Sequence, residues 1–312
     1  MADLDSIFSD DWGADHRSGI VAVVGQPNVG KSTLINAILG QKIAIVTSKP
    51  QTTRQRQLGI YTAADAQVLF VDTPGIHTPQ THLGEAMLGA ARHALRDADA
   101  VLWLLDASRV PNAADRRISD MLRQLAEKKP LILALNKADL LAADADLSGH
   151  LALCDHHCAL QTSAIKGQGI DALLEALLPV LPLGPRYYPA EQASDANLRF
   201  LAAELIREKV IEHTSDEIPY AVAVEITRFR EGAQRTQIEA TIFVERNSQK
   251  GIIIGKRGAM IKRIGSAARG ELQALLEATV RLDLRVKLLR NWRSNPDFMR
   301  RLGYASPKRA RN

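Results

Sequence analysis

Short apolar runs and amphipathic segments alternate along the chain between residues 19 and 182. Apolar runs that end in polar turns occur at 19–25, 67–75, 99–108, 130–139 and, more weakly, 158–167. Segments with apolar residues at helical spacing lie between and after them, at 30–40, 81–95, 115–128 and 170–182. Because strands that alternate with helices form βαβ units, this pattern predicts an α/β domain with a mostly parallel sheet.

The pattern changes after a segment rich in proline. A helical stretch at 197–214 is followed by two alternating, strand-like stretches at 220–230 and 237–246. Helical spacing then continues on both sides of a glycine loop in 251–278, and alternation returns at 280–289. The second part therefore predicts an α+β domain with the order α-β-β-α-α-β. A length of 312 residues is sufficient for two such domains.

These patterns set the expected domain boundaries. We expect an acidic extension at 1–18, a first domain at 19–183, a linker at 184–197, and a second domain with its tail at 198–305. The first residues and the tail after the second domain are expected to be disordered.

Charge is distributed unevenly between the two parts. Residues 1–184 carry 16 Lys and Arg against 20 Asp and Glu, a net charge of −4, whereas residues 185–312 carry 24 against 15, a net charge of +9. This asymmetry favours a polyanionic partner for the second domain, although a solvated basic surface without a partner is the alternative. The apolar runs are too short to span a bilayer, and the N-terminus has no secretory pattern. We expect a cytoplasmic monomer.

The stretch GQPNVGKS at residues 25–32 matches the phosphate-binding pattern G-x-x-x-x-G-K-[ST] and lies between a predicted strand and a predicted helix. Glycines allow successive backbone N–H groups to point at phosphates. Lys31 can reach the β- and γ-phosphates, and the Ser32 hydroxyl can bind Mg²⁺. This loop predicts a site for a nucleoside triphosphate.

NKAD at 136–139 indicates which base is bound. Guanine presents an N1–H and a 2-amino group, which the Asp139 carboxylate can accept side by side, and adenine lacks both donors. We expect Asn136 to bond the base and Lys137 to pack along it. Ser163 and Ala164, in SAIKG, are expected to support the base through backbone N–H groups.

DTPG at 72–75 and QTTRQ at 51–55 supply the remaining parts of the site. Asp72 is expected to hold Mg²⁺ through water, and the Gly75 N–H is expected to face the γ-phosphate. Thr53 is favoured over Thr52 as the threonine that closes over the metal. The expected nucleotide-binding residues are Gly25, Gln26, Pro27, Asn28, Val29, Gly30, Lys31, Ser32, Thr33, Asp72, Thr73, Pro74, Gly75, Ile76, Asn136, Lys137, Asp139, Ser163 and Ala164. Lys31, Thr53, Asp72 and Gly75 are the expected catalytic residues, and Ser32, Thr53 and Asp72 are the expected metal ligands.

Ile76 follows Gly75 at a position where the Ras-type pattern has a glutamine that orients the attacking water. Isoleucine has no donor or acceptor for that role. One hypothesis is a bound potassium ion held partly by Asn28, and the alternative is that Asn28 only orders the loop. Arg54 and Arg56 are candidates for an arginine finger by position only.

A second glycine loop, GIIIGKRG at 251–258, does not fit the nucleotide pattern, because Arg257 stands where a hydroxyl is needed. It fits the G-x-x-G loop of a KH domain, which clamps the backbone of about four single-stranded nucleotides. The α-β-β-α-α-β order is that of a type II KH domain. The expected RNA-binding residues are Lys250, Ile254, Gly255, Lys256, Arg257, Gly258, Lys262 and Arg263.

The five motifs of the first domain, with VERNSQKGIIIGKRGAMIKRIG and MRRLGY in the second, resemble the Era family of translation-factor-like GTPases over about residues 19–305. The resemblance implies a P-loop GTPase domain followed by a type II KH domain. It also implies GTP and GDP binding with Mg²⁺, hydrolysis of GTP to GDP and phosphate, and a GTP-dependent switch. The implied partner is small-subunit ribosomal RNA near its 3′ end, with a role in small-subunit assembly and peripheral contact with the inner face of the cell membrane.

Two other functions stay open on the sequence. One is an RNA-binding scaffold that holds GDP or GTP without useful turnover, and the other is a GTPase that acts on a different RNA cargo. Two local features also keep alternatives. CDHHC at 154–158 has metal-ligand residue types but poor spacing, because ligands usually come from separated elements. Trp292 can serve in packing or in base stacking.

Overall fold

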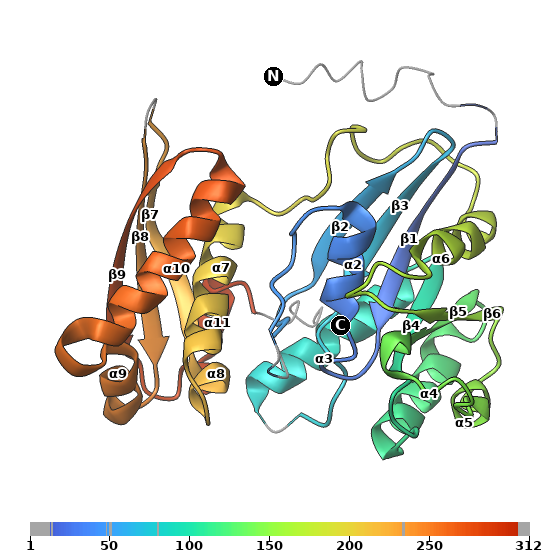
Figure 1. Ribbon diagram of the computed structural model, residues 1–312, viewed down its shortest axis with the longest axis horizontal. Coiled ribbons are helices and arrows are strands. Elements are labelled where there is room, and N and C mark those ends of the chain that lie inside the picture. The colour runs from blue at the N-terminus through green and yellow to red at the C-terminus, as the bar shows by residue number, and fades with distance from the viewer. Residues whose placement is uncertain are drawn as a thin grey trace, which may run out of the picture. The chain divides into compact units, whose positions relative to one another are not determined.

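The computed structural model describes residues 13, 15–47, 49, 52–79, 81–232 and 235–304. The chain forms two compact units (Figure 1). The first comprises Met1–Ala44, Thr53–Gln80 and Gly84–Asp195, and the second comprises Ile45–Thr52, Thr81–Leu83 and Ala196–Asn312. Most of the acidic extension and the tail beyond residue 304 lie outside the described residues.

The first unit contains a six-stranded sheet with the strand order β2-β3-β1-β4-β5-β6. The strands are β1 (Arg17–Val24), β2 (Gln57–Thr62), β3 (Ala66–Asp72), β4 (Ala100–Asp106), β5 (Leu131–Asn136) and β6 (Cys158–Thr162). All neighbouring pairs are parallel except β2 with β3, which is antiparallel. The predicted α/β class with a mostly parallel sheet is confirmed.

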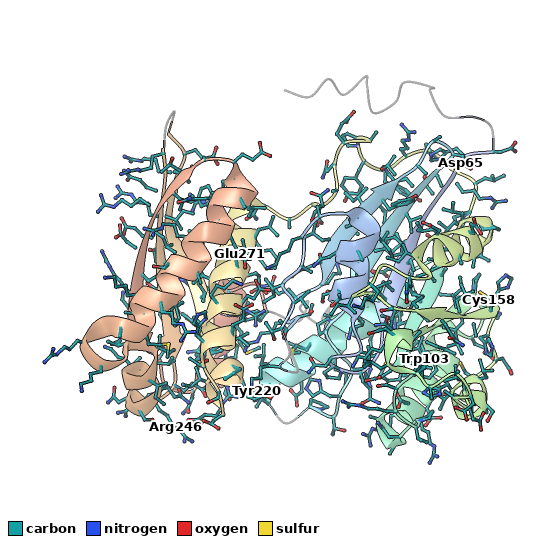
Figure 2. The ribbon with its side chains drawn as sticks, viewed as in Figure 1. Asp65, Trp103, Cys158, Tyr220, Arg246 and Glu271 are labelled. Carbon is teal, nitrogen blue, oxygen red and sulfur yellow. The ribbon has the colours of Figure 1, made fainter. Side chains whose placement is uncertain are left out.

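Helices cover both faces of this sheet, so the central strands are buried on both sides. They are α2 (Lys31–Leu39), α3 (His82–Asp97), α4 (Ala113–Ala126), α5 (Ser148–Leu151) and α6 (Ile170–Leu177). Residues of α2 and α6 pack with one face of the sheet, and residues of α3 and α4 pack with the other. Figure 2 labels Trp103 on β4, which is fully buried in the second of these layers.

The first unit differs from the sequence prediction at one boundary and by one additional strand. Strand β1 begins at Arg17, so the expected extension at 1–18 overlaps the sheet by two residues. Strand β2 was not predicted. Its central Gly59 hides the strand pattern, and a Cβ there would lie 2.9 Å from side-chain atoms of Ile35 and Leu39, so helix α2 approaches the strand where only glycine fits.

The segment expected to be a linker lies along the first unit. The buried Gln67 side chain on β3 accepts from the backbone N–H groups of Tyr187 and Tyr188, and it donates to the Tyr188 carbonyl at 2.8 Å. Farther along, the Ile60 N–H on β2 donates to the Ala193 carbonyl at 2.8 Å. The segment is therefore held on the first unit in two ways. The Gln67 side chain bonds the backbone of Tyr187 and Tyr188, and a backbone hydrogen bond joins Ala193 to the edge strand β2.

The second unit has the element order that the sequence predicted, with two short helices added. Its elements are α7 (Leu198–His213), α8 (Ile218–Ala221), β7 (Ala223–Arg230), β8 (Arg235–Val244), α9 (Asn247–Ile254), α10 (Ala259–Leu276), β9 (Thr279–Leu288) and α11 (Pro296–Arg301). The sheet order is β7-β8-β9, with β7 antiparallel and β9 parallel to β8. Apolar residues of α7 and α10 pack on the sheet and form one core. The predicted α+β type II KH class is confirmed.

Helix α7 is unusual because it buries charged residues. Arg207 is fully buried and pairs with Glu204 at 2.5 Å, and it also donates to the Thr52 carbonyl within the same unit. Lys209 pairs with Glu271 of α10, which Figure 2 labels. Among the described residues, no helix combines the length and the apolar character needed to cross a membrane.

Candidate nucleotide site and nucleic-acid surface

The loop between β1 and α2 depends on glycine at two positions. Gly25 has φ +152° and Gly30 has φ +103°, both in the region that favours glycine. A Cβ on Gly25 would lie 2.5 Å from the Leu104 carbonyl oxygen, and a Cβ on Gly30 would collide with the Asn136 side-chain amide. The loop therefore lies against β4 and the end of β5, directly before the N-terminus of α2, where a helix favours a bound anion.

Lys31 closes this loop from inside. Its Nζ donates to the carbonyls of Gly25 at 3.3 Å and Gln26 at 3.0 Å. Burial lowers the Lys31 pKa to about 8, although the nearby Asp72 carboxylate acts in the opposite direction. Among the described residues, the hydrogen-bond partners of this buried ammonium are two carbonyls. Such an ammonium is well suited to bind an anion, because phosphate oxygens would compensate the charge that burial takes out of water.

Three of the predicted metal-site residues come together at the start of α2. The Ser32 hydroxyl donates to Asp72 Oδ2 at 2.7 Å and lies 3.0 Å from the Thr53 hydroxyl, which itself lies 3.4 Å from the same carboxylate oxygen. Thr52 is directed elsewhere, since its hydroxyl bonds Thr47 and the Lys49 carbonyl. The preference for Thr53 over Thr52 agrees with this placement.

The chemistry of this cluster fits Mg²⁺. Asp72 is fully buried, and its Oδ1 has no hydrogen-bond partner among the described residues. Burial raises the Asp72 pKa, against the effects of Lys31 and the two hydroxyls. A buried carboxylate with an open oxygen, beside two hydroxyls, is an all-oxygen donor set of the kind that hard divalent cations prefer.

The segment after β3 lies tightly against the phosphate loop. A Cβ on Gly75 would come within 2.7 Å of the Pro27 nitrogen, and the Ile76 N–H donates to the Gly25 carbonyl at 3.1 Å. Thr73 is anchored by its hydroxyl to the Val23 carbonyl at 2.7 Å. The Ile76 side chain is buried in the apolar layer under α3, so it brings no polar group to the site.

Asn136 has contacts within the protein that the sequence did not predict. Its Nδ2 donates to the Val29 carbonyl at 2.7 Å, and its Oδ1 accepts from the Ala164 N–H at 3.0 Å and the Thr162 hydroxyl at 3.2 Å. The Nδ2 group carries two hydrogens, and the contact with Val29 uses one of them. Asn136 ties the phosphate loop to the loop after β6, and its expected bond to the base stays a prediction.

Asp139 and Ser163 lie together at the other end of the site. The buried Ser163 hydroxyl donates to Asp139 Oδ1 at 2.5 Å, which leaves Oδ2 as the outward acceptor of an exposed side chain. Lys137 adopts a left-handed backbone conformation, with φ +66°. Its Nζ donates to Asp106 Oδ2 at 2.6 Å.

Asp106 and Thr162 were missed by the sequence reasoning. Both occupy the last position of a strand, β4 and β6 respectively, at the edge where the other site residues gather. For Asp106 the available signal was a polar residue directly after a buried apolar run, whereas Thr162 follows the polar Gln161 and had no such signal.

The remaining loop residues fall into place around this frame. Gln26 donates to the Asn112 side chain at 3.1 Å, Val29 is buried, and Asn28 has a left-handed backbone with φ +64°. Thr33 is half-buried and Pro74 is buried. Arg54 is buried and Arg56 is exposed.

In the second unit, the loop between α9 and α10 requires its glycines. Gly255 has φ +71°, and a Cβ on it would lie 2.7 Å from the Met260 Cβ. Gly258 has φ +77° and Arg257 has φ +52°, so the loop makes a sharp turn before α10. Tight turns of this kind expose backbone N–H groups to an approaching phosphate.

Cations surround that loop. Lys256, Arg257, Lys262 and Arg263 are exposed, whereas Lys250 and Ile254 are half-buried. The two neighbouring isoleucines differ in exposure: Ile253 is fully buried in the core, and Ile252 is 49% exposed.

Two side features are settled by packing. Trp292 is fully buried, and its Nε1 donates to the Ala221 carbonyl at 2.7 Å, so it packs and cannot stack on a base. In CDHHC, burial raises the Cys154 pKa to about 11, and no group of three or more His, Cys, Asp or Glu in the described part of the chain could hold a metal ion.

Comparison with known proteins agrees with both halves of this picture. Residues 20–137 match the model of the 50S ribosome-binding GTPase family, and residues 217–293 match the KH domain family. The chain is 43% identical over 297 residues to GTPase Era of Ruminiclostridium cellulolyticum, a match that covers 94% of this chain and 99% of that protein.

Solved structures give the same result. A crystal structure of Era in complex with MgGDPNP and nucleotides 1506–1542 of 16S ribosomal RNA matches with a TM-score of 0.88 and 38% identity, covering 93% of this chain and 99% of that one. A variant of Aquifex aeolicus Era bound to GDP and AlF4⁻ matches with a TM-score of 0.85 and 37% identity, with the same coverage. With both domains matched over nearly their full length, the chain belongs to the Era family of GTPases.

Proposed function

We propose that this protein is a GTP-hydrolysing switch that binds small-subunit ribosomal RNA near its 3′ end and assists assembly of the small ribosomal subunit. The observation that carries the enzymatic half is the cluster of Ser32, Thr53 and Asp72 beside the buried Lys31. A metal held by these oxygens would lie beside the phosphates, where it neutralises the charge that develops during phosphoryl transfer.

The residues of the first unit divide the work of binding. The glycine loop and Lys31 hold the phosphates, and Asp139 accepts the two donors of guanine. Ser32, Thr53 and Asp72 would hold Mg²⁺, which when bound neutralises charge that develops on the phosphate oxygens. Gly75 lies against the phosphate loop, so its N–H can bond a γ-phosphate in the GTP state and loses that bond in the GDP state.

Hydrolysis needs a means of activating water other than residue 76, because Ile76 is buried and apolar. Asn28, at the tip of the phosphate loop, supports the proposal of a potassium ion as the additional cation. We expect faster turnover in potassium than in sodium at equal ionic strength, measured as phosphate release under single-turnover conditions. Equal rates in the two salts would contradict the potassium proposal.

The second unit supplies the RNA-binding surface of the proposal. The Gly255–Gly258 turn, flanked by exposed Lys256 and Arg257, fits the backbone of a single strand. The half-buried Ile254 and the cations Lys262 and Arg263 extend this surface. The RNA named for the related Era complex identifies the target to test, the 3′ end of small-subunit ribosomal RNA.

A pair of measurements on the full chain tests this function. Phosphate release from GTP and binding of a fluorescent RNA from the 3′ end of 16S ribosomal RNA are measured for the wild type, Asp72→Asn and Lys256→Ala/Arg257→Ala. Asp72→Asn is expected to abolish turnover, and the loop variant is expected to weaken RNA binding at least tenfold with unchanged GTP affinity. Nucleotide binding without any phosphate release would favour the scaffold alternative. Equal affinity for an unrelated RNA would favour a different cargo.

A cytoplasmic monomer with peripheral contact to the inner face of the cell membrane completes the proposal. The basic second domain, with a net charge of +9 over residues 185–312, supports attraction to anionic lipid. Co-sedimentation with phosphatidylglycerol vesicles and with neutral vesicles tests the contact, and light scattering on a sizing column tests the monomer. Absence of binding to the anionic vesicles at low salt would exclude the membrane contact.

A further inference from the structure

The backbone conformation of Lys137, in the first unit, is unfavourable for a residue with a side chain. Its backbone is left-handed, with φ +66° and ψ +34°, where a residue with a side chain is strained by roughly 1–2 kcal/mol. Glycine would adopt this turn more easily, so a lysine at this position raises the question of what its side chain does. The turn directs the chain from β5 into the short 3₁₀ segment Ala138–Leu140, which carries Asp139.

The Lys137 side chain is held by a prepared carboxylate. Its Nζ lies 2.6 Å from Asp106 Oδ2, and Asp106 is 12% exposed while Lys137 is 28% exposed. The backbones of these residues are adjacent, because Asp106 at the end of β4 pairs in register with Asn136 at the end of β5. The pair is therefore partly desolvated, in contrast to an ordinary surface ion pair.

Asp106 is itself fixed by its neighbours. Its Oδ1 accepts from the Ser108 hydroxyl at 2.6 Å and the Ser108 N–H at 3.2 Å, which locks the carboxylate orientation. Burial alone would raise the Asp106 pKa, but the hydrogen bonds from Lys137 and Ser108 outweigh it and lower the pKa. Asp106 thus stays ionised at neutral pH. Arg109 approaches Oδ2 at 3.5 Å but is 77% exposed and adds little.

We propose that Asp106 is a positioning residue for the nucleotide base: it holds the Lys137 ammonium at the end of β4, so that the aliphatic stem of Lys137 is fixed where the guanine ring packs. This inference rests on the proposed GTP-binding function. On this proposal, Asp106 slows release of the nucleotide. Hydrolysis depends on the residues around the phosphates and not on Asp106. Base selection stays with Asp139, which the Ser163 hydroxyl orients independently of Asp106.

The test uses the full chain and the dissociation rate of N-methylanthraniloyl-GDP, with kcat and KM for GTP measured in parallel. Asp106→Ala is expected to speed GDP release about tenfold, the effect of losing one charge-assisted hydrogen bond. KM should rise by a similar factor while kcat stays within about twofold. Asp106→Glu, which keeps the charge, should recover part of the loss, and Asp106→Asn should fall between the wild type and Asp106→Ala.

A double-mutant cycle separates positioning from a general effect on stability. Lys137→Ala alone should also speed GDP release, and Asp106→Ala should add almost nothing in the Lys137→Ala background. Asp146→Asn is the matched control, because Asp146 is exposed and its carboxylate bonds Ser148, which lies outside the site. This control should release GDP at the wild-type rate.

Several results would overturn the proposal. Unchanged GDP release in Asp106→Ala, or fully multiplicative effects of the two substitutions, would show that Asp106 does not act through Lys137. A fall in kcat at saturating GTP would place Asp106 in the hydrolysis step. Failure of the wild type itself to bind guanine nucleotides would overturn the proposed function, which distinguishes that failure from the loss of this inference.

Discussion

Replacement of Asn136 by alanine should destabilise the nucleotide-free protein, because the side chain connects two loops within the first unit. Asn136 is 2% exposed and takes part in three hydrogen bonds, with Val29, Ala164 and Thr162. Each of these partners is itself buried, so the substitution leaves three polar groups without their partner. At about 1 kcal/mol for each lost bond, the first unit should lose about 3 kcal/mol of unfolding free energy.

The assay is urea unfolding without nucleotide, followed by the fluorescence of Trp103, which is buried in the first unit. Trp12 and Trp292 are replaced by phenylalanine in all variants so that the signal reports this unit alone. With a urea slope of about 1–3 kcal/mol per molar, the midpoint should fall by about 1–3 M. Thr162→Ala serves as the partner variant, because it removes one of the three bonds and should cost about 1 kcal/mol, with no added cost for that bond in the double variant.

One result would refute this reasoning. If the nucleotide-free Asn136→Ala protein unfolds within about 0.5 kcal/mol of the wild type while GTP affinity collapses, Asn136 acts on the nucleotide and does not connect the loops. A loss of stability in the absence of nucleotide supports the connecting role.

Three further predictions follow from the geometry. Because the Lys31 pKa is lowered to about 8 in the free protein and phosphate binding raises it, GDP affinity should fall as pH rises above 8. Calorimetric titrations that show no decline between about pH 7.5 and pH 9.5 would contradict this. Arg207→Ala should lower the unfolding free energy of the second unit by about 3–5 kcal/mol, because Glu204 is left buried without its cation. Arg207→Met combined with Glu204→Met should leave it nearly unchanged. Urea unfolding compares the two variants, and equal losses of unfolding free energy would refute the prediction. Gly255→Ala should weaken RNA binding about tenfold or more, because φ at this residue is +71° and Met260 occupies the space that the added Cβ would need. Gly270→Ala on α10 is the control, because a Cβ there would meet no neighbouring atom. Equal RNA affinity of the two variants would contradict a role of the Gly255–Gly258 loop in RNA binding.

The sequence allowed the polar ends of the strands to be predicted well, because each motif follows an apolar run. Gly25, Lys31, Ser32, Asp72 and Asp139 all lie at the carboxyl edge of the sheet, as the alternation of elements requires. The prediction of Thr53 needed the chemistry of the metal site, since nothing local separates it from Thr52. What could be predicted was the set of residues at one edge.

The pairings within that set could not be predicted. Asn136 reaches Val29, 107 positions earlier, only because β5 and the phosphate loop meet in space. Asp106 has no local mark beyond its place at a strand end, and its partner Lys137 is defined by register across two strands. Strand β2 was missed for a related reason. Helix α2 packs so closely on it that only glycine fits at position 59, and a glycine weakens the strand pattern in the sequence.

The backbone hydrogen bonds of residues 184–195 have a consequence for how the first unit can be isolated. Strand β2 is an edge strand, and the Ala193 carbonyl together with the bridge between Gly59 and Ser194 covers its outer side. A fragment cut at residue 183 would expose that edge as a template for pairing with a second molecule, while a fragment that continues through residue 195 would keep it capped. The stretch that looks like a tether between domains thus also protects the nucleotide-binding sheet against aggregation.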